Sequence, residues 1–198
     1  LLVILVLIAA QISKINVKTH FIYGEVGQID VAKWFKILFI ENEGMAWGVQ
    51  IPGTYGKLFL TLFRLVAVGG IGYWLWDSVR IKSSNYLIVA ISLILVGAFG
   101  NIIDSVFYGV IFNDSSMKLA TLWTNEPYGT WFHGKVVDMF YFPIWKGYLP
   151  EWLPFWGRKY FTFFNAIFNV ADAAISVGVA LLILFNKKIF KDFDFVIN

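Results

Sequence analysis

The chain has 198 residues, of which 59% are hydrophobic and only 15% are charged, whereas soluble domains are about 45–50% apolar and about 25% charged. This composition excludes an ordinary soluble domain and predicts an integral membrane protein with a single domain over residues 1–198. The net charge of +3, without a dense basic cluster, argues against a nucleic-acid partner, and the absence of cysteine excludes disulfides and thiolate chemistry.

Four apolar stretches predict four transmembrane helices. Residues 58–76, 86–103 and 166–185 each reach the length of about 18 residues that a spanning helix needs. Residues 1–12 are shorter, and we interpret them as a trimmed first span; the alternative is the core of a signal peptide, which lacks its usual basic region here. Basic residues at 80, 82, 187, 188 and 191 favour both termini inside the cell, whereas Lys14 and Lys18 flank the first span on the outer side and oppose this orientation.

The remaining residues, 13–57 and 104–165, then form two outer segments. The first contains β-rich pieces at 31–40 and 45–51 around a glycine-containing break, which predicts a hairpin or small sheet. The second is aromatic from Trp131 to Phe164 and is interrupted by prolines; its rings either anchor it at the headgroups or pack in a small outer domain. The predicted fold is an all-α membrane protein with a small β element.

Polar side chains share one face of the third predicted span and one face of the fourth. Asn101 and Asp104 lie three residues apart near the end of the third span, and Asn169 and Asp172 do so near the start of the fourth. Because the third span ends on the side where the fourth begins, the two faces converge. We expect the two asparagines both to bind a substrate and to form interhelical hydrogen bonds worth about 0.6 kcal/mol each. Asp104 either belongs to the site or is a helix-end carboxylate at the water boundary.

Two aspartates stand in stretches apolar enough to lie at or inside a bilayer. Asp172 is two turns inside a span, where a charge costs at least about 2.5–3.5 kcal/mol, and Asp138 belongs to the outer segment, which can fold back to the same place. If the two carboxyl groups meet, their repulsion raises one pKa and the pair keeps one proton. Such a pair can hydrolyse a peptide bond without a metal, because one carboxylate activates water while the other protonates the carbonyl oxygen.

Other chemistries fit the sequence less well. Ser176 has no histidine on its span, and His133 with Asp138 lacks a hydroxyl at a recognisable spacing, which disfavours a serine triad. No metal-binding spacing appears, so we expect neither a metal nor a cofactor. A proton-coupled transporter with Asp172 and Arg64 as a relay is the rival class, although Arg64 alternatively reaches toward the headgroups, and a noncatalytic membrane adaptor is a third class.

Five motifs in order resemble the lipoprotein signal peptidases (signal peptidase II), which are aspartyl proteases of the bacterial inner membrane. The motifs are QISK at 11–14, NEGMAWG at 42–48, GAFGNIID at 97–104, VVDMF at 136–140 and FNVADAAI at 168–175. The resemblance implies four transmembrane helices with both ends cytoplasmic, a β-cradle after the first span and an aromatic-rich periplasmic arm over the cleft.

The resemblance also implies a reaction. Such enzymes remove the signal peptide of a prolipoprotein by cutting just before a diacylglyceryl-modified cysteine, and their two catalytic aspartates correspond to Asp138 and Asp172. The residues expected to bind substrate or support the site are Lys14, Asn42, Gly44, Asn101, Asp104 and Asn169. The expected partners are a lipid-modified prolipoprotein and membrane phospholipids, and we expect a monomer in the inner membrane with its active site at the periplasmic face.

Two positions depart from the family pattern. Ala10 stands where the first motif usually begins with an aspartate, and Ser105 stands where an arginine usually follows the aspartate of the third motif. In the family this arginine is the usual cationic contact to the substrate backbone, so another residue has to make that contact here. Lys135 and His133, just before the fourth motif, are candidates to replace it.

Overall fold

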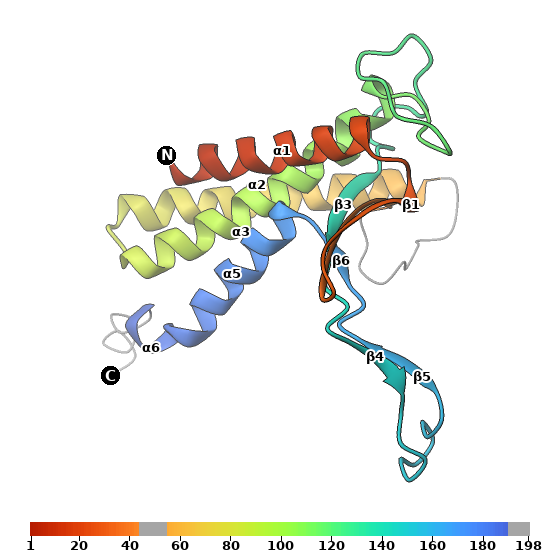
Figure 1. Ribbon diagram of the computed structural model, residues 1–198. Coiled ribbons are helices and arrows are strands. Elements are labelled where there is room, and N and C mark those ends of the chain that lie inside the picture. The colour runs from red at the N-terminus through yellow and green to blue at the C-terminus, as the bar shows by residue number, and fades with distance from the viewer. Residues whose placement is uncertain (44–54, 190–198) are drawn as a thin grey trace.

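The computed structural model describes residues 1–43 and 55–189 of the chain. Within these ranges, long helices pack side by side and two small antiparallel sheets lie toward one end of them (Figure 1). Gly44, one of the predicted site residues, lies outside the described residues. The helices are α1 (Leu2–His20), α2 (Gly56–Arg80), α3 (Asn85–Ile103), α4 (Gly109–Ile111), α5 (Val170–Leu184) and α6 (Asn186–Ile189), with a π-helical turn, η2, at Asp104–Tyr108.

Three helices in the described ranges are long and apolar enough to span a membrane. They are α1, α2 and the continuous helix Asn85–Ile111, which α3, η2 and α4 form together. Helix α5 has 15 residues, fewer than the about 20 that a perpendicular span requires. The prediction of a multi-pass membrane protein is therefore confirmed, whereas four spans stay a prediction.

Helix α1 is longer than the predicted first span, which ends at residue 12. It continues to His20 because Lys14 and Lys18, which interrupt the apolar stretch, each pair with a buried carboxylate. A charged side chain can stay buried when it is paired with an opposite charge. The first lysine therefore does not mark the end of this helix. The first outer segment therefore starts after His20 and not at Ser13.

Helix α3 lies at the centre of the bundle and packs against α1, α2 and α5. Its contact with α5 is close because both helices carry a glycine there. A Cβ at Gly97 would lie 2.2 Å from the carbonyl oxygen of Ala171, and one at Gly178 would lie 2.7 Å from that of Ala90. Small residues allow such an approach between membrane helices, and the contact holds the start of α5 against the end of α3.

Gly97→Ala is therefore expected to destabilise the protein. The added methyl group has no room, and overpacking of this kind costs typically about 1–3 kcal/mol, more than the preference of a helix for alanine over glycine of about 1 kcal/mol returns. Gly69→Ala in α2 is the matched control, because nothing lies within 4 Å of its added Cβ. Thermal unfolding in the same detergent compares the two variants. Equal melting temperatures would contradict the close α3–α5 contact.

The larger sheet has the strand order β1-β2-β3-β6, and all its neighbours are antiparallel. The strands are β1 (Gly24–Ala32), β2 (Phe35–Asn42), β3 (Val136–Tyr141) and β6 (Ile167–Phe168). The register places Ile40 of β2 opposite Asp138 of β3, and Phe140 of β3 opposite Phe168 of β6. Strand β3 is thus held on both sides, and β6 leads directly into α5.

The predicted small β element is confirmed, but its turn lies elsewhere. The prediction has one strand at residues 31–40, whereas the chain turns inside this range, at Lys33 and Trp34, between β1 and β2. Hydropathy does not reveal β1 because much of this strand is exposed and polar. The second predicted piece, residues 45–51, lies outside the described residues.

An apolar core joins the sheet to the ends of the helices. Side chains from α1, β2, β3 and the end of the third long helix meet in it: Val17, Phe39, Tyr108, Phe112, Val137 and Met139. Successive side chains of a strand point to opposite faces. Because Val137 and Met139 point into the apolar core, Asp138 between them points to the other face of β3.

The second sheet is a hairpin formed by β4 (Trp145–Tyr148) and β5 (Tyr160–Phe163). It belongs to the aromatic outer segment and extends away from the helices, starting from the larger sheet (Figure 1). That this segment covers a cleft, as the family resemblance implies, stays a prediction.

Candidate active site

Asp138 lies on the buried strand β3, and its side chain is almost inaccessible to solvent. One carboxylate oxygen accepts a hydrogen bond from Nδ2 of Asn169 at 2.6 Å, and the other accepts one from Nδ2 of Asn42. The predicted site residue Asn42 is therefore at the site, brought there by the pairing of β2 with β3. The contact with Asn169 joins the carboxyl group of Asp138 to the start of α5, and the contact with Asn42 joins it to β2.

Asp172 stands in the first turn of α5 and is half-buried. Its Oδ1 accepts a hydrogen bond from Nδ2 of Asn101 at 2.8 Å, and its Oδ2 accepts one from the backbone N–H of Asn169 at 3.1 Å. The positive end of the helix dipole also favours a negative charge here. The sequence predicts that the polar faces of the third and fourth spans converge, and Asn101 and Asp172 meet in this way.

Asn169 joins the two aspartates. It is fully buried and caps α5, because its Oδ1 accepts hydrogen bonds from the backbone N–H groups of Ala171 at 2.8 Å and Asp172 at 3.1 Å. The capping box starts the helix at Val170, four residues after the predicted start of this span. Since the side chain of Asn169 contacts Asp138 and its backbone contacts Asp172, one residue sets the relation of the two carboxyl groups.

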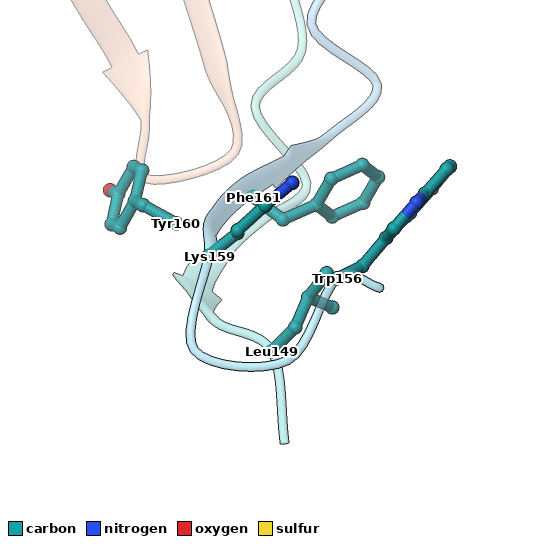
Figure 2. A pocket seen from close by; sticks show the side chains of 5 residues that line it. All are labelled: Leu149, Trp156, Lys159, Tyr160 and Phe161. Atoms are coloured by element: carbon teal, nitrogen blue, oxygen red, sulfur yellow. The ribbon is translucent and has the colours of Figure 1, made fainter. Parts of the chain in front are cut away.

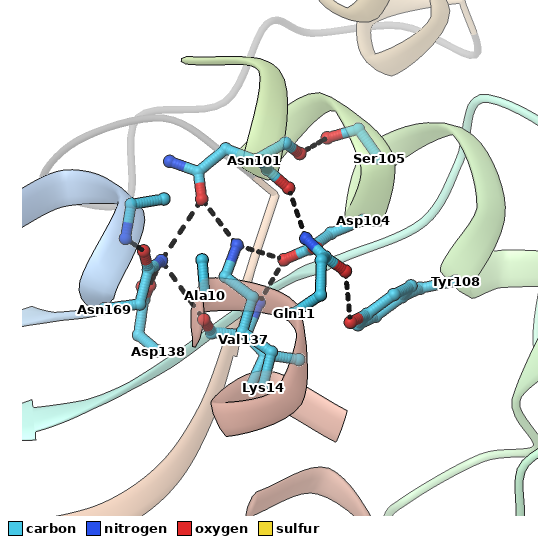
Figure 3. A network of polar contacts seen from close by, with 12 residues as sticks. Ala10, Gln11, Lys14, Asn101, Asp104, Ser105, Tyr108, Val137, Asp138 and Asn169 are labelled. Carbon is cyan, nitrogen blue, oxygen red and sulfur yellow. Dashed lines mark hydrogen bonds and ion pairs between the residues drawn. The ribbon is translucent and has the colours of Figure 1, made fainter. Parts of the chain in front are cut away.

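A buried ion pair supports this arrangement (Figure 3). Lys14 of α1 lies with its Nζ 2.6 Å from Oδ2 of Asp104 and 2.6 Å from Oδ1 of Asn101, and both Lys14 and Asp104 are fully buried. Asp104 also accepts a hydrogen bond from the backbone N–H of Val137 at 3.2 Å, next to Asp138. The chain of contacts therefore runs from α1 through the end of α3 to both aspartates.

Gln11 belongs to this network, although the sequence assigns it no role. Its Nε2 donates to the carbonyl oxygen of Gly100 at 2.9 Å and to Oδ1 of Asp104 at 3.3 Å, and its Oε1 accepts from the hydroxyl of Tyr108 at 3.0 Å. A signal was present, since Gln11 precedes Lys14 by three residues and shares its helical face.

The two departures from the family pattern occupy tightly packed positions. Ala10 is buried, and a Cβ at Gly100 would lie 4.0 Å from the Cβ of Ala10, so α1 and α3 are close here. Ser105 is also buried, and its hydroxyl donates to the carbonyl oxygen of Asn101 at 3.2 Å within the same helix. Neither residue contacts Asp138 or Asp172 among the described interactions.

Arg64 of α2 is half-buried and lies close enough to Asp172 for electrostatic attraction. The distance exceeds that of a direct ion pair, since none of the ion pairs between described residues joins these two side chains. Arg64 therefore contributes a positive field near Asp172 without a direct contact.

His133 and Lys135 lie elsewhere. They line a cavity of about 430 Å³ whose other lining side chains include Glu43, Lys57 and Tyr128. Nδ1 of His133 is 2.8 Å from the carbonyl oxygen of Trp131, and the backbone N–H of Lys135 donates to the hydroxyl of Tyr128 at 2.8 Å. The structure does not bring either residue to the aspartates, and their role in substrate binding stays a prediction. In the described part of the chain, no cluster of three carboxylates or imidazoles is arranged for a metal ion.

The surroundings of Asp138 favour a shared proton. Burial, and next the negative charge of Asp172, raise the pKa of Asp138 to about 7, although the hydrogen bond from Asn169 opposes the shift. A carboxyl group with this pKa is protonated in a substantial fraction of molecules at neutral pH. The pair can therefore hold one proton and one negative charge at the same time.

The raised pKa of Asp138 also predicts that stability depends on pH. Because the ordinary pKa is 3.8 and the folded value is about 7, the native state binds more protons than the unfolded state between these values, and stability falls as the pH rises. Asp138→Asn should lack this decline and should gain in melting temperature over the unchanged protein as the pH approaches 7. An unaltered slope in the variant would assign the decline to other groups.

Comparisons with known proteins find relatives that cover most of the chain. Residues 2–187 match the family model of signal peptidase (SPase) II. A lipoprotein signal peptidase of Porphyromonas gingivalis is 48% identical over 185 residues, which cover 92% of this chain and 80% of the relative. One of Amoebophilus asiaticus is 40% identical over 186 residues, which cover 91% of this chain and 74% of that relative.

A solved structure gives the same fold. A bacterial membrane enzyme determined by the in meso method at 2.3 Å resolution superposes with a TM-score of 0.60, covering 94% of this chain and 85% of the other, at 24% sequence identity. At this identity the likeness concerns the fold alone, whereas the family model spans nearly the whole sequence. The chain therefore belongs to the signal peptidase II family, as its five motifs predict.

Proposed function

We propose that this membrane protease is an aspartic endopeptidase that removes signal peptides from diacylglyceryl-modified prolipoproteins, cutting just before the lipidated cysteine. The observation that carries the proposal is the position of Asn169, whose side chain contacts Asp138 and whose backbone contacts Asp172. Two carboxyl groups held by one buried residue, at the end of apolar helices, suit the hydrolysis of a peptide bond next to lipid.

Asp172 is the general base in this proposal and Asp138 the general acid. Asp172 carries the negative charge because two N–H donors and a helix N-terminus face it, whereas the raised pKa of Asp138 keeps its proton. Water attacks the carbonyl carbon while Asp172 accepts its proton and Asp138 protonates the carbonyl oxygen. The tetrahedral intermediate then collapses: the C–N bond breaks, the amine receives the proton from Asp172, and Asp138 regains a proton from the hydroxyl group.

The supporting residues hold this geometry. Asn42 and Asn169 orient Asp138, and Asn101 orients Asp172. Lys14 and Asp104 act one step further away, because they fix Asn101 and the backbone beside Asp138. None of these groups has to change its charge during the reaction, so the pair of aspartates carries the proton transfers.

The membrane positions the substrate in this proposal. Helix α5, continued by α6, completes four spans, and Figure 1 places Leu1 and α6 toward the end of the bundle opposite the larger sheet. With the termini in the cytoplasm, the aspartates lie at the periplasmic side of the inner membrane. The acyl chains of the substrate remain in the hydrocarbon while the scissile bond reaches the site. The membrane thereby reduces the loss of translational and rotational entropy when the substrate is positioned for reaction.

A cleavage assay tests the proposed function. The purified protein in lipid should cut a diacylglyceryl-modified precursor peptide, and mass spectrometry should place the cut just before the modified cysteine. The same peptide without lipid is the control and should be cut much more slowly. No cleavage, together with proton flux in liposomes, would instead support a transporter, and inactivity in both assays would support an adaptor.

A further inference from the structure

The hairpin of β4 and β5 carries large aromatic side chains that are exposed in the described structure. The exposed rings include Tyr148, Trp152, Phe155, Trp156, Tyr160 and Phe161. Contacts of the strands are mainly with each other, through four paired positions from Trp145–Phe163 to Tyr148–Tyr160. A group of large exposed apolar side chains on a protein marks a site of interaction.

The tip of the hairpin presents one ring in an unusual conformation. Phe155 has a backbone φ of +65° and its side chain is 93% exposed. The ring of Phe155 is therefore presented outward and is accessible to the medium around the hairpin.

The charge of the hairpin is positive. Residues 144–164 contain Lys146, Arg158 and Lys159 and a single acidic residue, Glu151. Arg158 pairs with Glu151 at 2.8 Å, so the two lysines remain as the surplus. Aromatic rings beside basic side chains are the composition of segments that lie in the interface of an anionic bilayer.

A shallow pocket on the hairpin combines these features (Figure 2). Its volume is about 180 Å³, and it is lined by Leu149, Trp156, Lys159, Tyr160 and Phe161. Figure 2 shows the rings of Trp156 and Phe161 on the same side of the hairpin, while the ring of Tyr160 points to the other side. Apolar walls beside an ammonium group suit the part of a phospholipid where acyl chain and phosphate meet.

The direction of the hairpin places it along the membrane. In Figure 1 the hairpin leaves the larger sheet and extends to one side of the helices, away from them. Since helices of a multi-pass protein cross the bilayer, a segment that leaves their end sideways runs along the membrane surface. The exposed rings then lie at the level where tryptophan and tyrosine are favoured.

We propose that the β4–β5 hairpin is a membrane anchor whose aromatic side chains insert into the phospholipid interface, with Lys146 and Lys159 bound to anionic headgroups. The hairpin connects β3, which carries Asp138, to β6, which leads into Asn169. Its insertion therefore sets the depth of both aspartates relative to the lipid. The inference does not depend on the reaction that the aspartates perform.

The absence of cysteine from the chain allows a direct test. Phe155→Cys and Trp152→Cys each give one site for a nitroxide label, and the labelled full chain is placed in vesicles of phosphatidylethanolamine and phosphatidylglycerol. Power-saturation EPR with oxygen and a water-soluble nickel complex measures the depth of each label. We expect a depth of about 5–10 Å below the headgroups, as for other interfacial segments.

Two control labels calibrate the measurement. Met117→Cys lies on a polar outer loop, is 92% exposed and should report water. Val177→Cys lies on an exposed position of α5 and should report hydrocarbon. Protection from nickel at position 155 or 152 supports the anchor. Nickel access equal to that of position 117 at both positions overturns it.

The same labels distinguish the membrane from a second copy of the chain. If the hairpins of two copies pack together, the spectra at position 155 show dipolar broadening that increases with the protein-to-lipid ratio, which also overturns the proposal. Because no precursor is present, a failure of the anchor leaves the proposed cleavage untouched. Conversely, a protein whose hairpin is inserted but that does not cleave the precursor would count only against the proposed function.

Discussion

Asp138→Asn and Asp172→Asn are each expected to abolish cleavage of a diacylglyceryl-modified precursor. Each substitution removes one of the two groups that transfer protons, and a positioned acid or base contributes typically about 10²–10⁴-fold to a rate. Because the two carboxyl groups act as a unit, the double variant should lose little more activity than either single variant. Single-turnover cleavage in lipid measures all three.

The control for these variants is Asp30→Asn, which changes an exposed carboxylate of β1 and should leave cleavage unchanged. Each catalytic variant must also retain its helical content and insertion, so that a lost rate is not a lost fold. Retained cleavage by either variant would remove that aspartate from the proposed pair.

Lys14→Met is expected to have the largest effect on stability. It leaves the fully buried carboxylate of Asp104 without its cation, and breaking a buried ion pair in this way costs about 3–5 kcal/mol. For a chain of this size that corresponds to a decrease of roughly 6–20 °C in melting temperature. Cleavage should fall as well, because Lys14 also holds Asn101, which orients Asp172.

A second substitution separates charge from packing. Lys14→Met combined with Asp104→Asn removes the stranded charge but keeps an oxygen for the backbone N–H of Val137, so it should recover part of the lost stability. Lys36→Met is the matched control, because its partner Asp30 is largely exposed and such a pair is worth about 0–1 kcal/mol. A Lys14→Met variant as stable as the control would mean that the pair does not support the site.

The helices follow from local features of the sequence, and their exact ends often do not. Long apolar stretches predict α2 and α3 because length and composition alone decide whether a segment suits lipid. The end of α1 depends on Lys14, whose partner Asp104 is 90 residues away, so no local pattern could reveal that the helix continues. The start of α5 could have been predicted from the local sequence, since Asn169 and Asp172 have the spacing of a capping box.

The site shows the same division. The convergence of Asn101 and Asp172 follows from helical periodicity and from the order of the spans. The contact of Asn42 with Asp138 depends on the register of β2 against β3, and a slip of one residue would turn Asp138 to the opposite face. Sequence periodicity does not specify that register and therefore does not distinguish His133 and Lys135 from Asn42. In the structure His133 and Lys135 line a cavity with Glu43 and Tyr128, whereas Asn42 contacts Asp138.

The pH dependence of kcat/KM for the lipidated precursor tests the shared proton most directly. A pair in which one carboxyl group must be ionised and the other protonated gives a bell-shaped profile. Its basic limb should fall through about pH 7, where the proton of Asp138 is lost. A rate that keeps rising with pH through and beyond that value would contradict the proton-sharing pair of Asp138 and Asp172.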